Sequence, residues 1–195
     1  MKVLVACEES QEVCKAFRKL GHEAFSCDLQ ECSGCHPEWH IKDNVLKHLN
    51  DGWDLMIAHP PCTYLTHAAC RWLYPKGKLN QERYLKGLKA KEFFFKLLNS
   101  NIPLIAIENP KPSPIYELPK PSQIIQPYEF GHKLQKKTLL WLKGLQKLNP
   151  TNIVKPEWYY DHKGIRHTKL TGWSQKRKSK TFEGIAKAMA EQWGI

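Results

Sequence analysis

The cysteine at position 62 has a sequence setting that suits a nucleophile. The apolar run DLMIA, residues 54–58, predicts a buried strand, and a histidine and two prolines separate this strand from Cys62. Two consecutive prolines restrict two φ angles and remove two amide donors, so the thiol would be held on a stiff, extended loop. The sequence therefore predicts a nucleophile directly after a strand.

A carboxylic acid follows another apolar run in the same way. PLIAIENP, residues 103–110, predicts a strand that ends near Glu108. A thiol and an acid at neighbouring strand ends could act together on an electrophilic heterocycle. The thiolate would add to a ring carbon, and the acid, kept protonated by burial, would hydrogen-bond a ring nitrogen. We therefore predict Cys62 and Glu108 as catalytic residues.

The remaining pattern predicts the elements that position these two residues. Further strands are expected at 2–6, 23–29 and 137–144, and helices at 10–21, 45–50, 80–100 and 181–195. In the first helix Ser10 is a candidate N-cap and Gly21 a C-terminal stop. The long helix is expected to turn Leu85, Leu88, Phe94, Phe95 and Leu98 towards a core. Strands alternating with helices predict an α/β fold, a doubly wound and mostly parallel sheet covered on both faces.

Several polar residues would gather at one edge of this sheet. Ligands of doubly wound folds bind beyond the carboxyl ends of the strands. That edge would carry residues 7–10, 59–62 and 108–110 together with Asp28. Asp28 ends the second strand, where nucleotide-binding folds place a carboxylate on ribose hydroxyls. We therefore expect one site built from four strand ends.

The bulk composition indicates one reduced, cytoplasmic domain. The chain of 195 residues is 42% hydrophobic, and its first apolar run is broken by acids, so we expect neither an export signal nor a membrane span. Its seven cysteines are an odd number and are expected to be reduced. Cys32, Cys35, His36 and His40 are ligand types that zinc prefers, but their spacing matches no paired-knuckle pattern, and we expect no metal.

The charge distribution favours a polyanionic partner. The formal net charge is +11; residues 131–155 contain six basic residues and no acid, and residues 163–180 contain seven and no acid. Such stretches attract polyanions through counterion release, and nearby aromatic rings can stack on bases. A basic solvated surface would carry the same charges, but two acid-free stretches favour nucleic acid.

Pro-Pro-Cys after one strand and Glu-Asn after a later one resemble the two active-site signatures of the DNA cytosine-5 methyltransferases. The resemblance implies that Cys62 attacks C6 of a flipped-out cytosine, that Glu108 contacts N3, and that C5 receives a methyl group from S-adenosylmethionine. It also implies a Rossmann-like methyltransferase fold. The landmarks ACEES, CDL, HPPCTYL and ENP are similar to those of a compact phage or prophage subgroup.

The same resemblance implies a cofactor site. Its expected residues are Cys7, Glu8, Glu9, Ser10, Asp28, Leu29, His59 and Pro60, with Asp43 or Asn44 at the adenine. The family's first segment is rich in glycine, whereas this chain has Glu8, Glu9 and Glu12. These acids could bind the amino group of the cofactor or could cap the helix that follows. The last helix, residues 181–195, would close the cofactor pocket.

The substrate residues also follow from the resemblance. GHKLQKKTLLWL is similar to the family's Gln-x-Arg motif, with lysines in place of arginine, and so implicates Gln135 and Lys137 beside Pro61 and Asn109. Full-length members insert a sequence-reading domain where this chain has only the basic, aromatic residues 149–178. We expect this segment, with Arg166, Trp173 and Arg177, to hold nucleic acid, or a protein partner to supply the target recognition.

The sequence thus predicts a single-domain methyltransferase that acts on cytosine C5 in DNA. Two alternatives stay open at this point. One is an enzyme of the same fold that modifies an RNA cytosine or a free pyrimidine nucleotide. The other is a degenerate methyltransferase that binds DNA or protein, for example as an anti-restriction factor.

Overall fold

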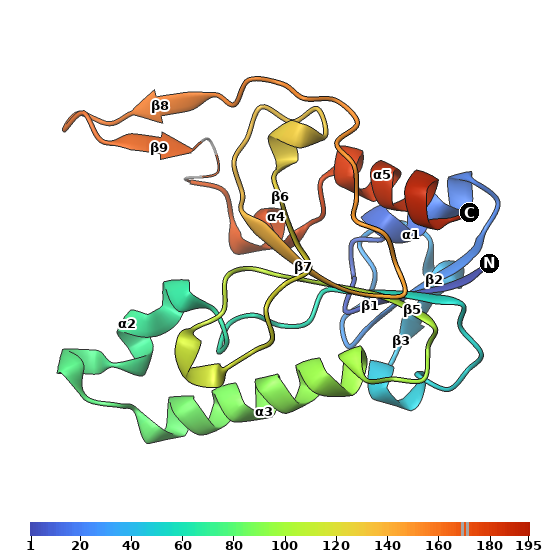
Figure 1. The fold of residues 1–195 in the computed structure, drawn as a ribbon, viewed down its shortest axis with the longest axis horizontal. Helices are drawn as coiled ribbons and strands as arrows, with labels where there is room; N and C mark the ends of the chain where they lie inside the picture. Colours follow the sequence, from blue (N-terminus) through green and yellow to red (C-terminus); the bar gives the residue numbers. More distant parts are fainter. Residues whose placement is uncertain (169, 171) are drawn as a thin grey trace.

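The computed structural model describes residues 1–168, 170 and 172–195 (Figure 1). Its main sheet is built from β1 (Lys2–Ala6), β2 (Glu23–Asp28), β3 (His40–Lys42), β4 (Leu55–Ala58), β5 (Leu104–Asn109), β6 (Gln123–Ile125) and β7 (Thr138–Lys143). The strand order is β3-β2-β1-β4-β5-β7-β6. The first five strands in this order are mutually parallel, and β7 runs antiparallel to both β5 and β6. This is the Rossmann order with β7 inserted next to β5, and it confirms the predicted Rossmann-like α/β fold.

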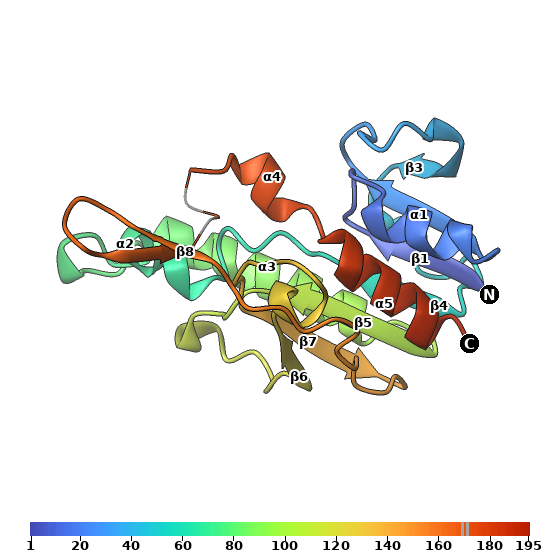
Figure 2. The same ribbon diagram turned by 90° about the horizontal axis from the view of Figure 1, so that it is seen from above.

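Helices cover both faces of the sheet, as predicted. The helices are α1 (Glu12–Lys19), α2 (Cys70–Leu73), α3 (Gln81–Leu98), α4 (Gln175–Ser179) and α5 (Glu183–Trp193). Side chains alternate along β1: Val3 and Val5 join the core formed with α1 and α5, whereas Leu4 and Ala6 join the core formed with α3. Figures 1 and 2 show α1 and α5 on one side of the sheet and α3 on the other.

Short elements connect these layers. Single 3₁₀ turns occupy Pro37–Trp39, Val45–Lys47, His67–Ala69, Pro75–Gly77, Pro114–Tyr116 and Pro127–Glu129. The predicted helix at 45–50 is one of these turns, since an asparagine caps it and it ends after one turn. The three-residue strands β3 and β6 were not predicted, because their side-chain alternation is too short to recognise in the sequence.

Helix α3 shows one error in the predicted core face. Phe94 is fully buried, but Leu85 is 56% exposed. Near its first turns the helix packs through Gly87, where an added Cβ would lie 2.1 Å from the ring of Tyr116. Residues two apart on a helix point in nearly opposite directions, so the close approach at Gly87 turns Leu85 towards solvent.

The start of α1 also differs from the prediction. Ser10 is not the cap; Gln11 occupies the N-cap position with a left-handed φ of 59° and makes no side-chain capping bond. The carboxylate of Glu8 accepts hydrogen bonds from the amides of Val13 at 2.8 Å and Cys14 at 3.2 Å. A carboxylate satisfies the free amides better than a hydroxyl because it also interacts favourably with the positive end of the helix dipole. Gly21, with a φ of +83°, follows the helix as predicted.

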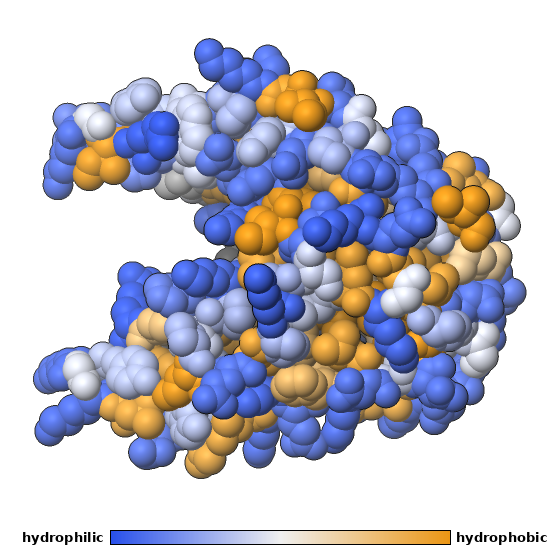
Figure 3. All heavy atoms as spheres, in the orientation of Figure 1, coloured by the Kyte–Doolittle hydropathy of each residue, from blue (hydrophilic) through white to orange (hydrophobic). Residues whose placement is uncertain are grey.

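Two arms extend from the same side of the sheet. One is a hairpin formed by the antiparallel strands β8 (Trp158–Tyr160) and β9 (Arg166–Thr168), and the other carries α2 (Figure 1). Asp161 stabilises the hairpin turn by accepting bonds from the amides of Lys163 and Ile165, both at 2.9 Å. Figure 3 shows a notch between the two arms, open to solvent and rimmed mainly by hydrophilic residues. Within the described residues, no helix has the length and apolar character needed to span a membrane.

Candidate active site

A cavity of about 1000 Å³ lies at the carboxyl edge of the parallel strands. The loops that follow β1 and β4 both line it, so it lies where the strand order reverses, the usual ligand position in this fold. The predicted site residues that line it are Cys7, Glu8, Glu9, Ser10, Asp28, His59, Pro60, Pro61, Cys62, Glu108, Asn109 and Lys137. The four predicted strand ends therefore meet in one place.

The loop after β4 holds Cys62 in a fixed turn. The amide of His59 extends the sheet by donating to the carbonyl of Ala6 at 2.9 Å. The carbonyl of Cys62 then accepts bonds from the amides of Leu65 at 3.0 Å and Thr66 at 2.9 Å. The thiol itself is partly exposed and lines the cavity. Burial and, to a smaller extent, the negative charge of Glu108 raise the pKa of Cys62, so the thiol keeps its proton at neutral pH.

Glu108 differs from the prediction in its charge. Oε2 of Glu108 lies 2.9 Å from Nδ1 of His59, and the two side chains are only 13% and 12% exposed. Burial alone would raise the pKa of Glu108, but the positive charge of Lys136 and the bond to His59 outweigh it and lower the pKa to about 2. The carboxyl group is therefore ionised rather than kept protonated by burial, because burial came with two cationic partners.

His59 carries the compensating charge. Burial would lower the pKa of its imidazole, but the hydrogen bond and charge of Glu108, together with the charge of Glu8, raise it above the ordinary value. Both shifts favour a charged pair, an imidazolium beside a carboxylate, and both side chains are nearly buried. The sequence placed His59 beside the nucleophile but could not show that Glu108, 49 residues away, is its partner.

Lys136 is a site residue that the sequence did not identify. It lines the cavity and acts electrostatically on Glu108, Cys62 and His59. Because β7 is antiparallel, its first residue, Thr138, and the lysines before it lie at the edge where the parallel strands end. The basic run Gln135-Lys136-Lys137 is visible in the sequence, but its similarity to the Gln-x-Arg motif implicated Gln135 and Lys137 rather than the residue between them. Gln135 does not line the cavity.

The loop after β1 contains non-glycine residues in a backbone conformation that only glycine adopts without strain. Cys7 and Gln11 both have a φ of 59°, in the left-handed region that favours glycine. Such strain in non-glycine residues is concentrated at functional sites. Cys7 is held by a bond from its amide to the carbonyl of Cys27 at 2.7 Å, and burial, followed by the charge of Asp28, raises the pKa of its thiol to about 12. Glu8 caps α1, so it takes the second of the two predicted roles, cofactor binding or helix capping.

Three buried polar atoms in residues that line the cavity have no hydrogen-bond partner among the described residues. They are Oε2 of Glu9, Nε2 of His59 and Nδ2 of Asn109. The ammonium of Lys176, in α4, approaches Oε2 of Glu9 only to 4.0 Å. Buried polar atoms are almost always paired, so three unpaired atoms around one cavity indicate a polar ligand.

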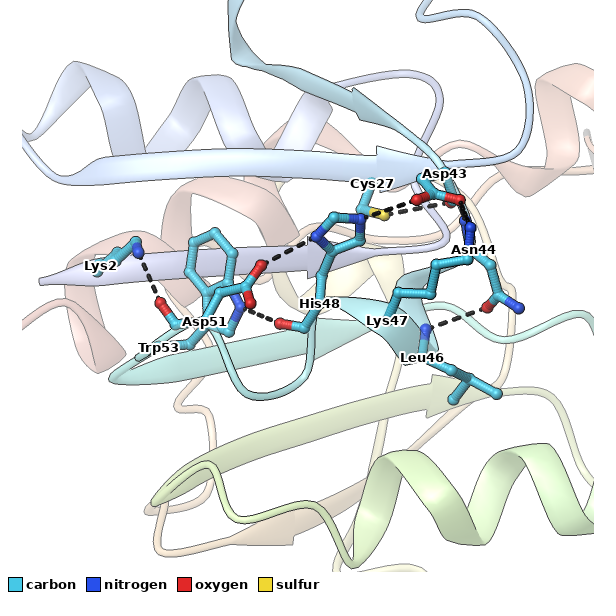
Figure 4. A network of polar contacts seen from close by, with 9 residues as sticks. All are labelled: Lys2, Cys27, Asp43, Asn44, Leu46, Lys47, His48, Asp51 and Trp53. Carbon is cyan, nitrogen blue, oxygen red and sulfur yellow. Dashed lines mark hydrogen bonds and ion pairs between the residues drawn. The ribbon is translucent and has the colours of Figure 1, made fainter.

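Asp43 and Asn44 lie outside the residues that line the cavity. Figure 4 shows both in a network at the end of β3. Asp43 lies 2.8 Å from Nζ of Lys47 and 3.3 Å from Nε2 of His48, and the bond to Lys47, followed by that from the amide of Asn44, lowers its pKa to about 2. Asn44 accepts the amide of Leu46 at 3.1 Å and so caps a turn. Their role at an adenine stays a prediction.

The remaining predicted residues lie further out. Leu29 is 72% exposed next to Asp28. In the hairpin, the guanidinium of Arg166 lies 4.2 Å from the ring centre of Trp158; near α4, that of Arg177 lies 3.7 Å from the ring centre of Trp173. Both are cation–π stacks, the first on the hairpin arm and the second at α4. Pro110, expected at this edge, lines the cavity as well. Lining residues that were not individually predicted are Gln30, Thr63, Thr66, Ala68, Ala69, Trp72, Arg83, Lys136, Thr138, Lys178, Ser179, Lys180 and Thr181.

The cysteine and histidine segment at 27–40 serves local structure. His40 uses both ring nitrogens, one 2.8 Å from Oγ of Ser26 and the other 2.9 Å from the carbonyl of Gln30. All seven cysteines are free thiols. In the part of the chain that the structure describes, no three histidine, cysteine or acidic side chains gather as a metal-ion site.

Comparison with known proteins found similarity among solved structures. No family model and no curated protein matches the chain. A crystal structure from E. coli, described as that of a proposed DNA modification methyltransferase encoded within a prophage, is similar with a TM-score of 0.49 and 11% sequence identity. The match covers 78% of this chain and 51% of that one, so this chain spans about half the length of its neighbour. A likeness of this degree says nothing about the reaction.

Proposed function

We propose that this protein is an S-adenosylmethionine-dependent methyltransferase that acts on cytosine C5 in DNA. The observation that carries the proposal is that Cys62, from the β4 loop, and Glu108, at the end of β5, line the same cavity. The β1 loop and Asp28 line it as well, at the position where Rossmann-like folds bind a nucleoside. A nucleophile, an acid and a cofactor loop are thus available in one site of about 1000 Å³.

In this reaction Cys62 forms the covalent bond and Glu108 handles the proton. The sulfur attacks C6 of a cytosine that has left the base stack, and the Glu108 side chain delivers a proton to N3, which draws electrons away from C5–C6. The thiol must first lose its proton, and Lys136 assists because its charge lowers the pKa of Cys62 against the larger effect of burial. Pro60 and Pro61 keep the sulfur-bearing loop from folding back into the sheet.

The residues at the β1 loop fit the proposed cofactor. The unpaired carboxylate oxygen of Glu9 suits the ammonium group of the methionine moiety, and Asp28 at the end of β2 suits the ribose hydroxyls. Exposed Leu29 offers an apolar surface beside them. When bound, the cofactor supplies an electrophilic methyl group.

Calorimetry tests the role of Glu9. We expect Glu9→Gln to weaken the binding of S-adenosylmethionine at least about 10-fold, because a charge-assisted hydrogen bond is lost in a buried site. Glu38→Gln is the control, since Glu38 pairs with His36 at 3.0 Å outside the cavity. Equal affinities of the two variants would remove Glu9 from the cofactor site.

The arms suit a nucleic-acid substrate. The net charge of +11 and the notch between the hairpin and α2 favour a polyanion held across the cavity (Figure 3). Trp72 of α2 lines the cavity and is 58% exposed, and Tyr160 of the hairpin is 66% exposed. Exposed rings on both arms can stack on bases, as single-strand and flipped-base binders require.

A labelling assay tests the proposal. The protein is incubated with radiolabelled S-adenosylmethionine and, separately, with duplex DNA, single-stranded DNA, tRNA and dCMP. Label at C5 of DNA cytosine is the expected result. Label only in tRNA or dCMP would assign the enzyme a different substrate. If no substrate is labelled and calorimetry detects no cofactor binding, the protein is not a methyltransferase and the DNA- or protein-binding alternative is favoured.

Covalent trapping tests the nucleophile. Duplex DNA with 5-fluorocytosine should capture the wild-type protein, and Cys62→Ser should abolish the adduct. Cys70→Ser is the matched control, because Cys70 is also a free, partly exposed thiol, hydrogen-bonded to Ser113 and absent from the cavity wall. An adduct of unchanged yield with Cys62→Ser would contradict the mechanism.

A further inference from the structure

We propose that His59 supplies the proton that Glu108 delivers to the pyrimidine ring, so that the two residues act as one acid. This inference rests on the proposed function and assigns a proton-transfer role to a residue that neither the Pro-Pro-Cys nor the Glu-Asn signature includes. Its basis is the contact between Nδ1 of His59 and Oε2 of Glu108 at 2.9 Å inside the cavity.

The contact joins two neighbouring strand ends. His59 follows β4 directly and Glu108 lies near the end of β5, and these strands are parallel neighbours. Both side chains are nearly buried and both line the cavity. No other side chain among the described residues donates a hydrogen bond to this carboxylate. His59 is therefore the side chain placed to pass a proton directly to Glu108.

The charges around the pair place the proton on the histidine before substrate binds. The ionisable groups that interact with the pair are Glu8 from the β1 loop, Lys136 from the segment before β7 and Cys62 from the β4 loop. Glu8 and Glu108 favour the charged imidazole, while Lys136 opposes it and favours the carboxylate. The pKa of His59 is raised and that of Glu108 is lowered, in agreement with this geometry.

The step is balanced in atoms and electrons. It starts from the Cys62 thiolate, whose proton has passed to solvent. Sulfur donates an electron pair to C6, the π pair of C5–C6 shifts to C4–C5, and the π pair of N3–C4 moves onto N3, which takes up a proton. The Nδ1–H bond of His59 breaks as an O–H bond forms on Glu108, and that O–H bond breaks as the N3–H bond forms. His59 ends as imidazole and Glu108 ends as the carboxylate with which it began.

A purely structural role of His59 would not account for two features of the site. The anchoring bond of residue 59 to Ala6 is made by its backbone amide, which any residue except proline could donate. The second ring nitrogen, Nε2, is buried and has no partner among the described residues. A ring held only for packing would not leave a polar atom unpaired in a ligand cavity.

The pH dependence of single-turnover methylation tests the inference. We expect His59→Gln to lower the rate about 100-fold at pH values where wild-type His59 is protonated. The ratio of wild-type to variant rate should shrink as the pH rises through the raised pKa of His59, because the wild-type pair then loses its proton too. A structural role would give a ratio that does not depend on pH. Thermal unfolding and cofactor binding verify that the variant is folded, and His59→Asn serves as a second variant.

His48→Gln is the matched control. His48 also lies 2.9 Å from a carboxylate, that of Asp51, but outside the cavity. We expect its rate to match the wild type at every pH. If His59→Gln also methylates at the wild-type rate with an unchanged pH profile, the inference is wrong while the proposed function stands. If the wild type methylates nothing, both are wrong.

Nitrogen-15 NMR of the histidine rings examines the pair without catalysis. We expect His59 to be doubly protonated at neutral pH, with a titration midpoint that falls in Glu108→Gln. A neutral His59 at pH values below its ordinary pKa, or a midpoint unmoved by Glu108→Gln, would overturn the inference whatever the methylation assay shows.

Discussion

Two histidine–carboxylate pairs of equal length lie in different surroundings. His59 and Glu108 approach to 2.9 Å with side chains 12% and 13% exposed, while His48 and Asp51 approach to 2.9 Å with side chains 23% and 47% exposed. Water screens the second pair, so its charge has little effect beyond the contact. In the first pair, neighbouring charges rather than water decide where the proton resides. Equal distance therefore does not imply equal chemistry.

The pairs also differ in what they join. His48 and Asp51 are three residues apart and close a local turn, in which the carbonyl of His48 accepts the indole N–H of Trp53 at 2.7 Å (Figure 4). His59 and Glu108 are 49 residues apart and join two strand ends at a cavity. The His59–Glu108 contact forms only when the sheet assembles, and unpaired polar atoms lie beside it. It is therefore a better candidate for a catalytic role than the His48–Asp51 contact.

The largest expected effect is on the methylation rate, which should depend on Glu108 and not on Asp51. Glu108→Gln should lower the single-turnover methylation rate by about 10²- to 10⁴-fold, because the amide cannot pass a proton to N3. Asp51→Asn should leave the rate unchanged. Rapid-quench measurements at saturating cofactor make the comparison, and a Glu108→Gln rate near that of the wild type would remove the distinction between the pairs.

A smaller effect is expected on acid stability. The pKa of Glu108 is lowered from 4.5 to about 2 in the folded protein, so its stabilisation is present above pH 4.5 and is lost as the pH falls towards 2. We expect this to contribute on the order of 3 kcal/mol to the free energy of unfolding at neutral pH. Urea unfolding across the acid range should show a shallower pH dependence for Glu108→Gln, whereas Asp51→Asn should retain the wild-type slope.

The smallest effect concerns Lys136, the cation that acts on the buried pair. Lys136→Met should raise the pKa of both Cys62 and Glu108, since the ammonium lowers both. Alkylation of Cys62 by iodoacetamide, followed by mass spectrometry, should become about 3- to 10-fold slower at a fixed pH below the thiol pKa. Lys133→Met is the control, because Lys133 pairs with Glu157 at 3.0 Å outside the cavity. Equal rates for the two variants would mean that Lys136 does not act on the thiol.

Some of the site could be predicted because strand ends obey a simple rule. Cys62, Glu108 and Asp28 each follow an apolar run, and parallel strands bring their carboxyl ends to one edge. Asp43 also follows a strand, but β3 is the outermost strand on its side of the sheet, and the side chain is engaged by Lys47 and His48. The sequence could not show that Lys47 and His48 engage this carboxylate.

The protonation of the site could not be predicted from residue types. A buried acid was expected to be neutral, and Glu108 is ionised because His59 and Lys136 surround it. Likewise the acids after β1 had two open roles, and the start of α1 at Glu12 directs Glu8 to the helix amides while an oxygen of Glu9 stays unpaired. These outcomes depend on the positions of charges a few ångströms apart.

By itself the sequence determined the alternating strands and helices, the stiff loop that carries Cys62 and the edge at which the polar residues gather. Those properties follow from local periodicity and from proline geometry, which act over a few residues. Only the tertiary structure decided that His59 pairs with Glu108 and that Lys136, just before the antiparallel strand β7, acts on both. Charge interactions depend on distance in space, and the folded sheet alone brings residues from three separate segments within that distance.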